Sequence, residues 1–493
     1  MTHVAVAAVT TVALLAGGSR VVAAQAPAEA PARPLAVAAA LADLALLERT
    51  LETIHPGYVR FVPHEQHAAR FAAVRERIGG GTTDAALYLE VSRLLEAIRC
   101  DHTKAEYPER LWKWREANRS HLPFTTKLLD GRIFLDACAG PGLARGDELI
   151  ELDGLGAAAL QAEILALISI DGRTDFARVA EAEASSEYMG SGLDHFLPLL
   201  HGFRDRFTVT VRGDLGRGPA RTVEAPALRH GDWAKLAAGA APQASEFADA
   251  VSVERFEDPA VALLRVDTFV NYREPVDAVA KFAALFRELN EEQIDHLIVD
   301  LRQNGGGSTD ASHALLAHLI EAPLTVGLPP FVRCTRVPDD LRPHLTTWES
   351  GAFDPPAALF EPAADGLFRM KGEPSVVAPA RESFTGSRIT LLSSRGNASG
   401  TTMLLAALQP LERVRVVGER TGGSVEGPTA GTLFFLTLPA SGIKVRVPVL
   451  RNVTGLVPSE PGMGVVPDRE AVLTADAWLA GDDPALAAAL GEE

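Results

Sequence analysis

Cysteine is scarce in this chain, which has three, Cys100, Cys138 and Cys334, among 493 residues. So small and odd a number excludes a disulfide framework and allows one bridge at most. Positive charge is also in short supply, because 47 lysines and arginines stand against 64 aspartates and glutamates, a net charge of -17. Nucleic-acid binding needs clustered basic residues that displace counterions, so no nucleic-acid partner is expected.

Long uncharged apolar runs are missing beyond the first residues. A bilayer span takes about 20 apolar residues, and no later stretch qualifies, which excludes a multi-pass membrane protein. The early run, Val4 to Gly17, is too short to span and is followed by Val22-Ala23-Ala24, which suits cleavage before Gln25. The sequence therefore predicts a signal peptide and a periplasmic or secreted protein. An uncleaved anchor and an alternative start are the other interpretations.

The remaining composition is that of an ordinary globular protein, with 47% hydrophobic and 23% charged residues. The chain is too long for one core, and two to four domains are expected. After a Pro/Ala-rich tether up to Pro34, apolar positions such as Leu41, Leu44 and Leu47 recur at helical spacing as far as Arg99. This spacing predicts three helices.

From about residue 122 to residue 228 the pattern changes to short strands. Segment 142–154, GLARGDELIELDG, resembles the signature of PDZ domains, in which two glycine turns bracket one alternating strand. A generic β-hairpin is the alternative. The polar stretch 174–200 is predicted to be a helical insertion, and strand structure is expected to return at 207–211.

From about residue 261 to residue 469, predicted strands alternate with predicted helices. The strands are expected at 262–266, 297–301 and 389–393, and the helices at 276–289, 312–319 and 401–408. Such alternation indicates a mainly parallel sheet with crossover helices. Functional groups of these sheets lie at the carboxyl ends of the strands.

Two turns at such strand ends contain residues suited to catalysis. The first, Asp300 to Ser308, has three successive glycines at 305–307, whose exposed backbone N–H groups could bind an oxyanion. It lacks both the Walker pattern and the dinucleotide pattern, so it does not indicate phosphate binding. A tight turn between helix and sheet is the purely structural interpretation.

The second turn places Ser399 just before a predicted helix. The helix macrodipole and the N–H of Gly400 would favour negative charge on the attacking and attacked oxygens. A serine at this position is also a common helix N-cap. The spacing differs from the nucleophile elbow of α/β-hydrolases, because Asn397 and not glycine stands two residues before the serine.

The two turns and the PDZ-like segment together resemble the tail-specific, or C-terminal-processing, serine peptidases. Leu297 to Gly307 is similar to their strand and oxyanion turn, and Asn397-Ala-Ser-Gly matches their nucleophile motif, with the serine at Ser399. The resemblance covers roughly residues 35 to 475. In the branch that uses a Ser–Lys dyad, the position of the lysine corresponds here to Ser424. A different base is therefore required.

The tricorn-core branch of the family uses a histidine at the end of its helical N-terminal region, and this histidine corresponds to His102. The resemblance implies that His102 is the base, and an imidazole with an ordinary pKa of ~6.5 suits that role near neutral pH. Asp101, where the branch has a serine, is expected either to orient the ring or to cap the helix end. The branch also has a glutamate near the segment matched by Gly464 to Asp468, and Glu460 is the candidate, offset by about one residue.

No metal or other cofactor is expected. His64 and His67 are three positions apart, whereas the helix of a zinc protease needs a spacing of four. A Cys100–His102 pair is a weaker alternative to Ser399, because near-adjacent side chains project differently and Ser399 lies in the better turn.

The sequence thus predicts a multidomain α/β serine endopeptidase with a core of the Clp protease/crotonase type and a peptide or protein substrate. Ser399 would be the nucleophile, His102 the base, and the N–H groups of Gly306 and Gly400 the oxyanion hole. The PDZ-like domain would bind the C-terminal strand of a substrate. The alternatives are a non-catalytic ligand- or peptide-binding protein, as in the interphotoreceptor retinoid-binding relatives, and a hydrolase of small esters or amides.

The predicted division of the chain is a signal peptide (1–24), a linker (25–34), a helical N-terminal domain (35–115), a PDZ-like domain with a helical insertion (116–228), a connector (229–255), a catalytic α/β core (256–475) and a C-terminal helix (476–493).

Overall fold

The computed structural model describes residues 32–183, 188–240, 244, 246–256 and 260–491. The predicted signal peptide and most of the predicted linker lie outside the described residues. The next part of the chain forms the three expected helices, α1 (Val37–Ile54), α2 (His64–Arg77) and α3 (Asp84–Glu96). Leu44, Leu47 and Leu51 are fully buried, which confirms the helical spacing. The Thr83 hydroxyl caps α3 by accepting a hydrogen bond from the Ala86 N–H.

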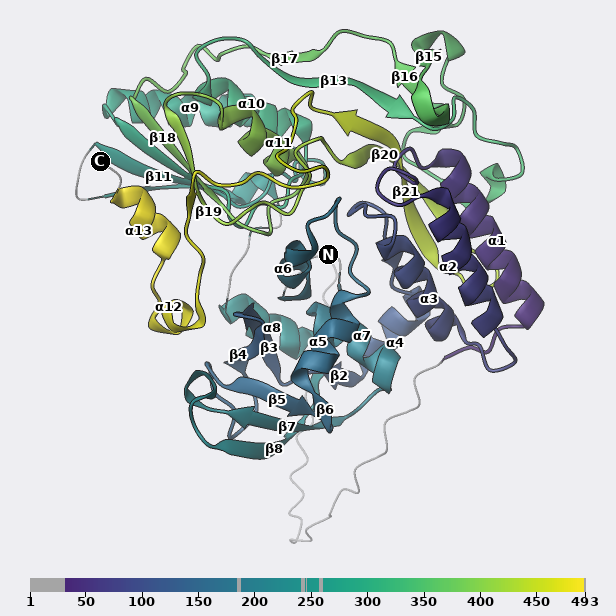
Figure 1. Ribbon diagram of the computed structural model, residues 1–493. Helices are drawn as coiled ribbons and strands as arrows, with labels where there is room; N and C mark the ends of the chain where they lie inside the picture. Colours follow the sequence, from purple (N-terminus) through teal and green to yellow (C-terminus); the bar gives the residue numbers. More distant parts are fainter. Residues whose placement is uncertain (1–31, 184–187, 241–243, 245, 257–259, 492–493) are drawn as a thin grey trace, which may run out of the picture.

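The second half of the chain contains the predicted parallel sheet (Figure 1). In spatial order its strands are β10 (Val251–Arg255), β11 (Val261–Val266), β12 (His296–Asp300), β18 (Arg388–Ser393), β19 (Val414–Gly418) and β22 (Arg469–Glu470). Only the pairing of β10 with β11 is antiparallel. Every residue of β12 is buried, as expected for a strand covered on both faces.

Helices cover both faces of this sheet. On one face, α9 (Ala278–Glu291), α10 (Thr309–Leu319) and α11 (Ser399–Leu408) pack on alternate strand residues such as Leu264 and Val299. On the other face, Ile298 and Leu392 contact alanines of α13 (Pro484–Leu490). The two sets alternate along the strands because successive side chains of a strand point to opposite faces.

The strands β3 to β8, between residues 124 and 226, form an antiparallel sheet, here called the β-module. Its order is β3 (Phe124–Leu129), β4 (Arg132–Cys138), β5 (Glu148–Leu152), β7 (Arg206–Arg212) and β8 (Ala220–Pro226), with β6 (Leu155–Gly156) beside β5 and α5 (Ala157–Leu165) packed on the sheet. The predicted insertion contains α6 (Arg178–Glu183) and α7 (Gly192–His201). In Figure 1 α6 lies between the β-module and the parallel sheet.

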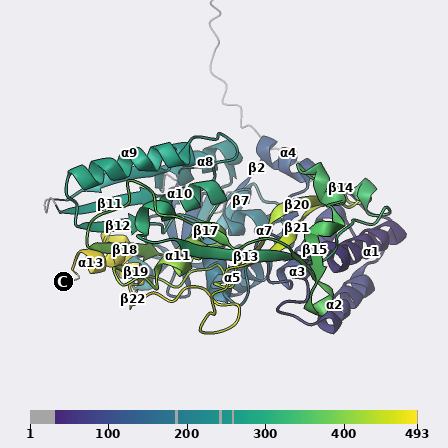
Figure 2. The same cartoon turned by 90° about the horizontal axis from the view of Figure 1, so that it is seen from above.

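An eight-stranded sheet that the sequence did not predict joins the two halves. Its order is β14 (Leu345–Thr346), β20 (Thr429–Thr437), β21 (Lys444–Val453), β13 (Leu324–Val332), β16 (Phe368–Met370) and β15 (Phe360–Pro362), with β1 (Ala105–Glu106) on β21 and β17 (Ser375–Val377) on β13. Seen from above, β13 runs from the parallel sheet toward the side where α1 to α3 lie (Figure 2). Val445 and Val447 of β21 belong to the same hydrophobic core as α1, α3 and the β-module.

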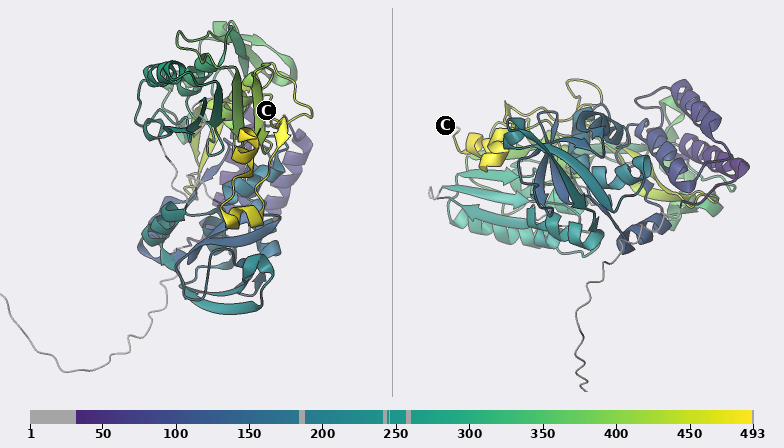
Figure 3. Two further views of the ribbon diagram at one scale, coloured as in Figure 1. Left: turned by 90° about the vertical axis from the view of Figure 1, so that its left-hand side faces the viewer. Right: turned by 90° about the horizontal axis from the view of Figure 1, so that it is seen from below.

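The C-terminal segment forms two short helices instead of one. Gly481, with φ 82°, ends α12 (Ala475–Ala480) before α13 begins. Trp478 of α12 packs with Phe134 of the β-module, while α13 lies on the parallel sheet (Figure 3). All three cysteines are free thiols. Across the described residues we find no helix with the length and apolar character needed to cross a membrane.

Candidate active site

The two glycine- and serine-containing turns follow β12 and β18, which are adjacent parallel strands, so both lie at the same edge of the sheet. A Cβ atom placed on Gly306 would lie 2.9 Å from the Ser399 Cβ and 3.2 Å from the Gly400 nitrogen. Gly306 has φ 114° and Gly307 has φ 139°, conformations that favour glycine. The structure therefore brings together Ser399, Gly400 and Gly306, whose roles stay predictions.

Two fully buried asparagines join these turns. The Asn397 side-chain amide donates to the carbonyls of Leu301 (2.6 Å) and Asn304 (3.0 Å). The Asn304 side chain donates to the Val266 carbonyl and accepts from the Thr401 hydroxyl (2.7 Å). Because unpaired buried amides are costly, this mutual pairing fixes both turns in one arrangement. The sequence motif contained Asn397 but gave no reason to pair it with Asn304.

Ser399 is the first residue of α11, is half-buried, and has a positive φ of 47°. A non-glycine residue in this region is strained, and such strain is concentrated at functional sites. Ala398 precedes the helix and offers no capping side chain. The Gly400 N–H lies in the first turn, where no intrahelical acceptor exists, at the positive end of the helix dipole.

The amides of the glycine turn are not equivalent. The Gly306 N–H donates to the Asn304 Oδ1 at 2.9 Å, so an oxyanion role for this group requires it to exchange that acceptor. The N–H groups of Gly305 and Gly307 make no hydrogen bond within the part of the chain that the structure describes. The sequence could not distinguish the three glycines, because their amide directions depend on the Asn304 side chain.

His102 lies in a short segment after α3 that is held from both sides. The Thr103 hydroxyl is 2.8 Å from the His55 Nε2, and the His55 Nδ1 accepts from the Gly57 N–H at 3.1 Å. Burial lowers the pKa of His55 to about 3, so this ring is neutral and carries its proton on Nε2. The Cys100 thiol donates to the Thr429 carbonyl of β20 at 3.3 Å.

Asp171, which the sequence left unassigned within the β-module region, is the acidic group beside His102. One ring nitrogen of His102, one carboxylate oxygen of Asp171 and the Cys100 sulfur lie within 4.8 Å of one another. The Asp171 Oδ1 accepts from the Asp101 N–H at 3.0 Å. Burial raises the pKa of Asp171, and the nearby His102 opposes that rise. No motif or spacing marked Asp171, because its contact with His102 is purely tertiary.

The two other predicted carboxylates point elsewhere. The Asp101 Oδ1 lies 2.8 Å from the Lys104 Nζ, an ion pair within one short segment. Glu460 is exposed, and its backbone carbonyl accepts from the Met463 N–H. The neighbouring Gly462 does lie near the site, because its carbonyl accepts a hydrogen bond from the Arg173 N–H at 2.8 Å. The Glu460 carboxylate itself lies in solvent.

Hydrogen bonds connect the Asp171 loop to the nucleophile turn. The buried Thr174 hydroxyl is 2.7 Å from the Asp171 carbonyl and 2.6 Å from the Gly422 carbonyl. The Gly422 N–H in turn donates to the Asn397 carbonyl at 2.8 Å, two residues before Ser399. The segment beside His102 and the segment that carries Ser399 are thus joined through two intermediate residues.

Cys100, His102 and Asp171 form the one potential metal-ligand group found among the described residues. Burial raises the pKa of the Cys100 thiol far above its ordinary range, and the thiol already donates to Thr429. A metal ligand must be a thiolate, so these residues do not favour a metal. His64 and His67 do not converge either, because His64 is near Glu52 and His67 stacks on Tyr58.

The edge strand of the β-module, β3, is covered by the chain itself. Glu183 of α6 accepts from the Leu128 N–H and from the Lys127 ammonium, both at 2.6 Å. Arg395, in the nucleophile turn, donates to the Leu128 carbonyl at 3.0 Å. The remaining hollow between β3, α5 and α6 is about 10 Å³, which holds one water at most. In this conformation no peptide strand fits on β3 beside Leu128.

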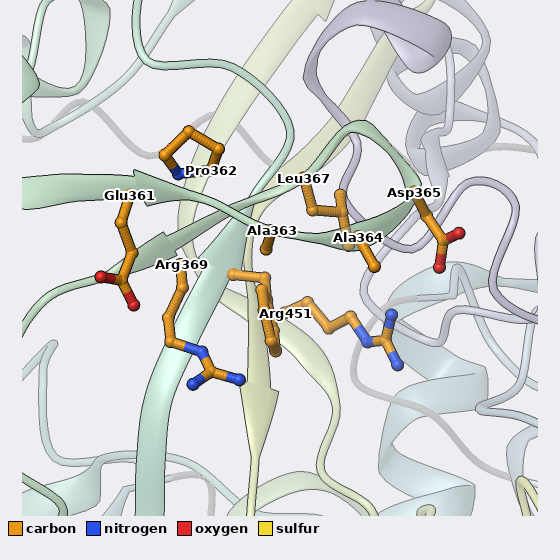
Figure 4. A pocket seen from close by; sticks show the side chains of 9 residues that line it. Glu361, Pro362, Ala363, Ala364, Asp365, Leu367, Arg369 and Arg451 are labelled. Atoms are coloured by element: carbon orange, nitrogen blue, oxygen red, sulfur yellow. The ribbon is translucent and has the colours of Figure 1, made fainter.

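A larger hollow of about 440 Å³ lies on the eight-stranded sheet (Figure 4). Its lining comes from β13, β15, β16, β21 and the intervening loop, and Arg369 and Arg451 both stack over the ring of Phe331. No residue of the turns that carry Ser399, Gly306 or His102 lines it. The candidate catalytic residues therefore lie outside this hollow.

One family model and several solved structures are similar to this chain. Residues 260–471 match the sequence model of peptidase family S41, whereas no curated protein sequence matches the chain. Mature CPAF is similar with a TM-score of 0.60 at 17% identity, over 90% of this chain and 94% of CPAF. Mature CPAF complexed with lactacystin gives a TM-score of 0.58 at 17% identity, over 90% and 95% of the two chains.

The photosystem II D1 C-terminal processing protease matches over 89% of this chain and 94% of its own, at 16% identity and a TM-score of 0.42. The likeness to CPAF, at such low identity, shows a shared fold across nearly the whole chain. The part of the chain that matches the S41 model contains Ser399, the glycine turn and both asparagines. Residues 260–471 are thus similar to peptidase family S41, and the chain is a serine-type peptidase.

Proposed function

We propose that this chain is an exported serine endopeptidase that cleaves C-terminal tails or unfolded polypeptides, with Ser399 as nucleophile and His102 as base. The observation that carries the proposal is the position of Ser399. Ser399 has a strained backbone, is the first residue of α11 and lies directly beside the Gly306 turn. It lies inside the part of the chain that matches the peptidase family. The export half of the proposal rests on the signal-peptide pattern of the first 24 residues.

The chemistry is acyl transfer in two steps. The Ser399 hydroxyl oxygen attacks the carbonyl carbon of the scissile peptide bond while His102 takes the hydroxyl proton, and His102 then gives this proton to the departing amine. Water, deprotonated by the same imidazole, then attacks the resulting ester, the bond between the acyl carbon and the Ser399 oxygen breaks, and the imidazolium returns its proton to that oxygen. The half-buried position of His102 and the hydrogen bonds that lead from its neighbour Asp101 through the Asp171 loop to Asn397 support this pairing.

Backbone amides would stabilise the oxyanion. The Gly400 N–H at the start of α11 is one donor, and the turn 305–307 supplies the other. This second donor is either the Gly306 N–H, once its hydrogen bond to the Asn304 Oδ1 is broken, or the N–H of a neighbouring glycine. One such donor is worth about 2.7 to 4 kcal/mol of transition-state stabilisation. The buried Asn304–Asn397 pairing supports the proposal, since it holds these amides in place before the substrate arrives.

Recognition of a substrate tail by the β-module requires a conformational change. A peptide added to β3 needs the Leu128 N–H and carbonyl, which Glu183 and Arg395 now occupy. An incoming C-terminal carboxylate would therefore compete with the Glu183 carboxylate. A PDZ-like function of the β-module is consistent with an edge strand that already binds a carboxylate.

The test is labelling of the mature protein with a fluorophosphonate, which reacts with activated serines. We expect labelling of the wild type and its loss in both Ser399→Ala and His102→Ala, with circular dichroism to show that each variant is folded. His64→Ala, an exposed histidine of α2, is the matched control and should label normally. Labelling that persists in Ser399→Ala would contradict the assignment of the nucleophile.

Substrate class is tested separately with fluorogenic peptides and small esters. Turnover of internally quenched peptides, lost in Ser399→Ala, is the expected result. Turnover of esters alone would indicate a small-molecule hydrolase, and the absence of both labelling and turnover in folded wild type would favour a non-catalytic binding protein.

A further inference from the structure

Three acidic side chains compete for the role of orienting His102. Asp101 is ion-paired with Lys104, and Glu460 is exposed. Asp171 is buried to 96% and has one oxygen, Oδ2, without a hydrogen-bond partner among the described residues. The His102 Nδ1 is likewise buried and unpartnered there. Two complementary groups, each unpaired, therefore lie in one cluster whose candidate ligand atoms are within 4.8 Å.

We propose that Asp171 is the positioning residue of this site, whose Oδ2 accepts a hydrogen bond from the His102 Nδ1–H and thereby presents Nε2 to Ser399. The proposal rests on the proposed function, since it assigns a partner to the same base. Buried donors and acceptors are almost always paired, so the shortest way to satisfy both orphan atoms is with each other. A carboxylate on Nδ1 also fixes the tautomer that a general base needs.

The Asp171 loop is built rigidly enough for this role. The Gly172 N–H donates to the Arg99 carbonyl at 3.0 Å, and a Cβ at Gly172, where φ is 59°, would lie 2.2 Å from the Gly462 carbonyl oxygen. The Thr174 hydroxyl fixes the other end of the loop. The backbone conformation beside Asp171 is therefore determined both by Arg99, at the start of the segment that carries His102, and by Gly462.

The charged groups that face Asp171 are few. Burial and the Asp101 charge oppose the ionised form of Asp171. His102 favours this form, and so does Arg60, which lies in the turn between α1 and α2. Lys104, paired with Asp101, reduces the effect of that carboxylate.

The test combines nitrogen-15 NMR of histidine-labelled protein with fluorophosphonate labelling, on wild type and Asp171→Asn. His102→Gln assigns the His102 signals. In wild type we expect the Nδ1–H tautomer, and in Asp171→Asn a loss of that preference. The labelling rate should fall on the order of 10⁴-fold, as when the acid partner of a catalytic histidine becomes an amide.

The matched control is Glu460→Gln, which should leave the NMR signals of His102 unchanged and the labelling rate within about threefold of wild type. An unchanged His102 tautomer in Asp171→Asn would overturn the proposal whether or not the protein labels. If the NMR change occurs but wild type does not label, the contact between Asp171 and His102 stands and the proposed peptidase chemistry fails. If Asp171→Asn leaves the NMR signals of His102 unchanged and Glu460→Gln alters them strongly, the positioning role belongs to Glu460.

Discussion

The nucleophile turn and the segment that carries His102 are constructed in different ways. The nucleophile turn is supported by its own strand end and the adjacent one, through Asn397, Asn304 and the glycines. The base segment is held by remote parts of the chain, namely His55 after α1, Thr429 in β20 and the Asp171 loop. The first is a local property of a parallel sheet, and the second depends on correct assembly of several regions.

The largest effect is expected at the nucleophile turn, where a single methyl group should abolish function. In Gly306→Ala the Cβ would lie 2.9 Å from the Ser399 Cβ at a φ of 114°, so labelling should fall by more than about 10³-fold through the loss of oxyanion geometry. Gly305→Ala is the matched control, because its nearest new contact is at 3.9 Å. Equal labelling rates of the two variants would remove the glycine turn from the site.

A smaller effect is expected at the connection between the two regions. Thr174→Val removes the hydroxyl that bridges the Asp171 and Gly422 carbonyls, so we expect a loss of about 1 kcal/mol in the free energy of unfolding and roughly tenfold slower labelling. Thr210→Val, whose hydroxyl pairs with Thr222 on an exposed face, should change neither by a comparable amount. A stability loss without any change in labelling would show that the two segments are independent.

The base segment should also be sensitive to acid. The pKa of His55 is about 3 in the folded protein, against an ordinary value of about 6.5, so the unfolded chain binds the extra proton first as pH falls. Stability is therefore lost from about pH 6.5 downward, by about 1.4 kcal/mol per pH unit from this group, until the folded pKa is reached.

Urea denaturation at pH 7, 6 and 5 measures this slope. His55→Gln should reduce the slope between pH 6 and pH 5, while His64→Gln, on the exposed side of α2, should keep it. An unchanged slope in His55→Gln would mean that other buried histidines, such as His296 with a pKa lowered to about 4, dominate the acid response.

The smallest effect is expected at the β-module edge that touches the nucleophile turn. Glu183→Gln weakens the contact of α6 with Lys127 and Leu128, so binding of a peptide with a free C-terminus, measured by fluorescence anisotropy, should tighten several-fold. Glu163→Gln on α5, whose carboxylate contacts His201 at an exposed position, is the control. Weaker peptide binding in Glu183→Gln would show that α6 helps to form the peptide site instead of covering it.

The regions differ equally in what could be read from the sequence. The six strands and helices predicted between residues 262 and 408 are all present, because continuous apolar runs and glycine turns are local signals. The eight-stranded sheet was missed, since β13 contains Pro329 and Pro330 and shifts register between Leu328 and Phe331. Prolines normally argue against a strand, and only pairing with β21, far along the chain, decides otherwise.

The candidate site shows the same division. By itself the sequence determined the turn that carries Ser399 and the glycine turn beside it, because the required backbone conformations and helix start follow from residue types within a few positions. Only the tertiary structure decided that Asp171 lies beside His102, that Asn304 occupies the Gly306 amide, and that α6 covers β3. The first and third contacts join residues far apart in the chain, and the second depends on an Asn304 side chain that Val266 and Thr401 hold in place. All three depend on packing, which no local pattern encodes.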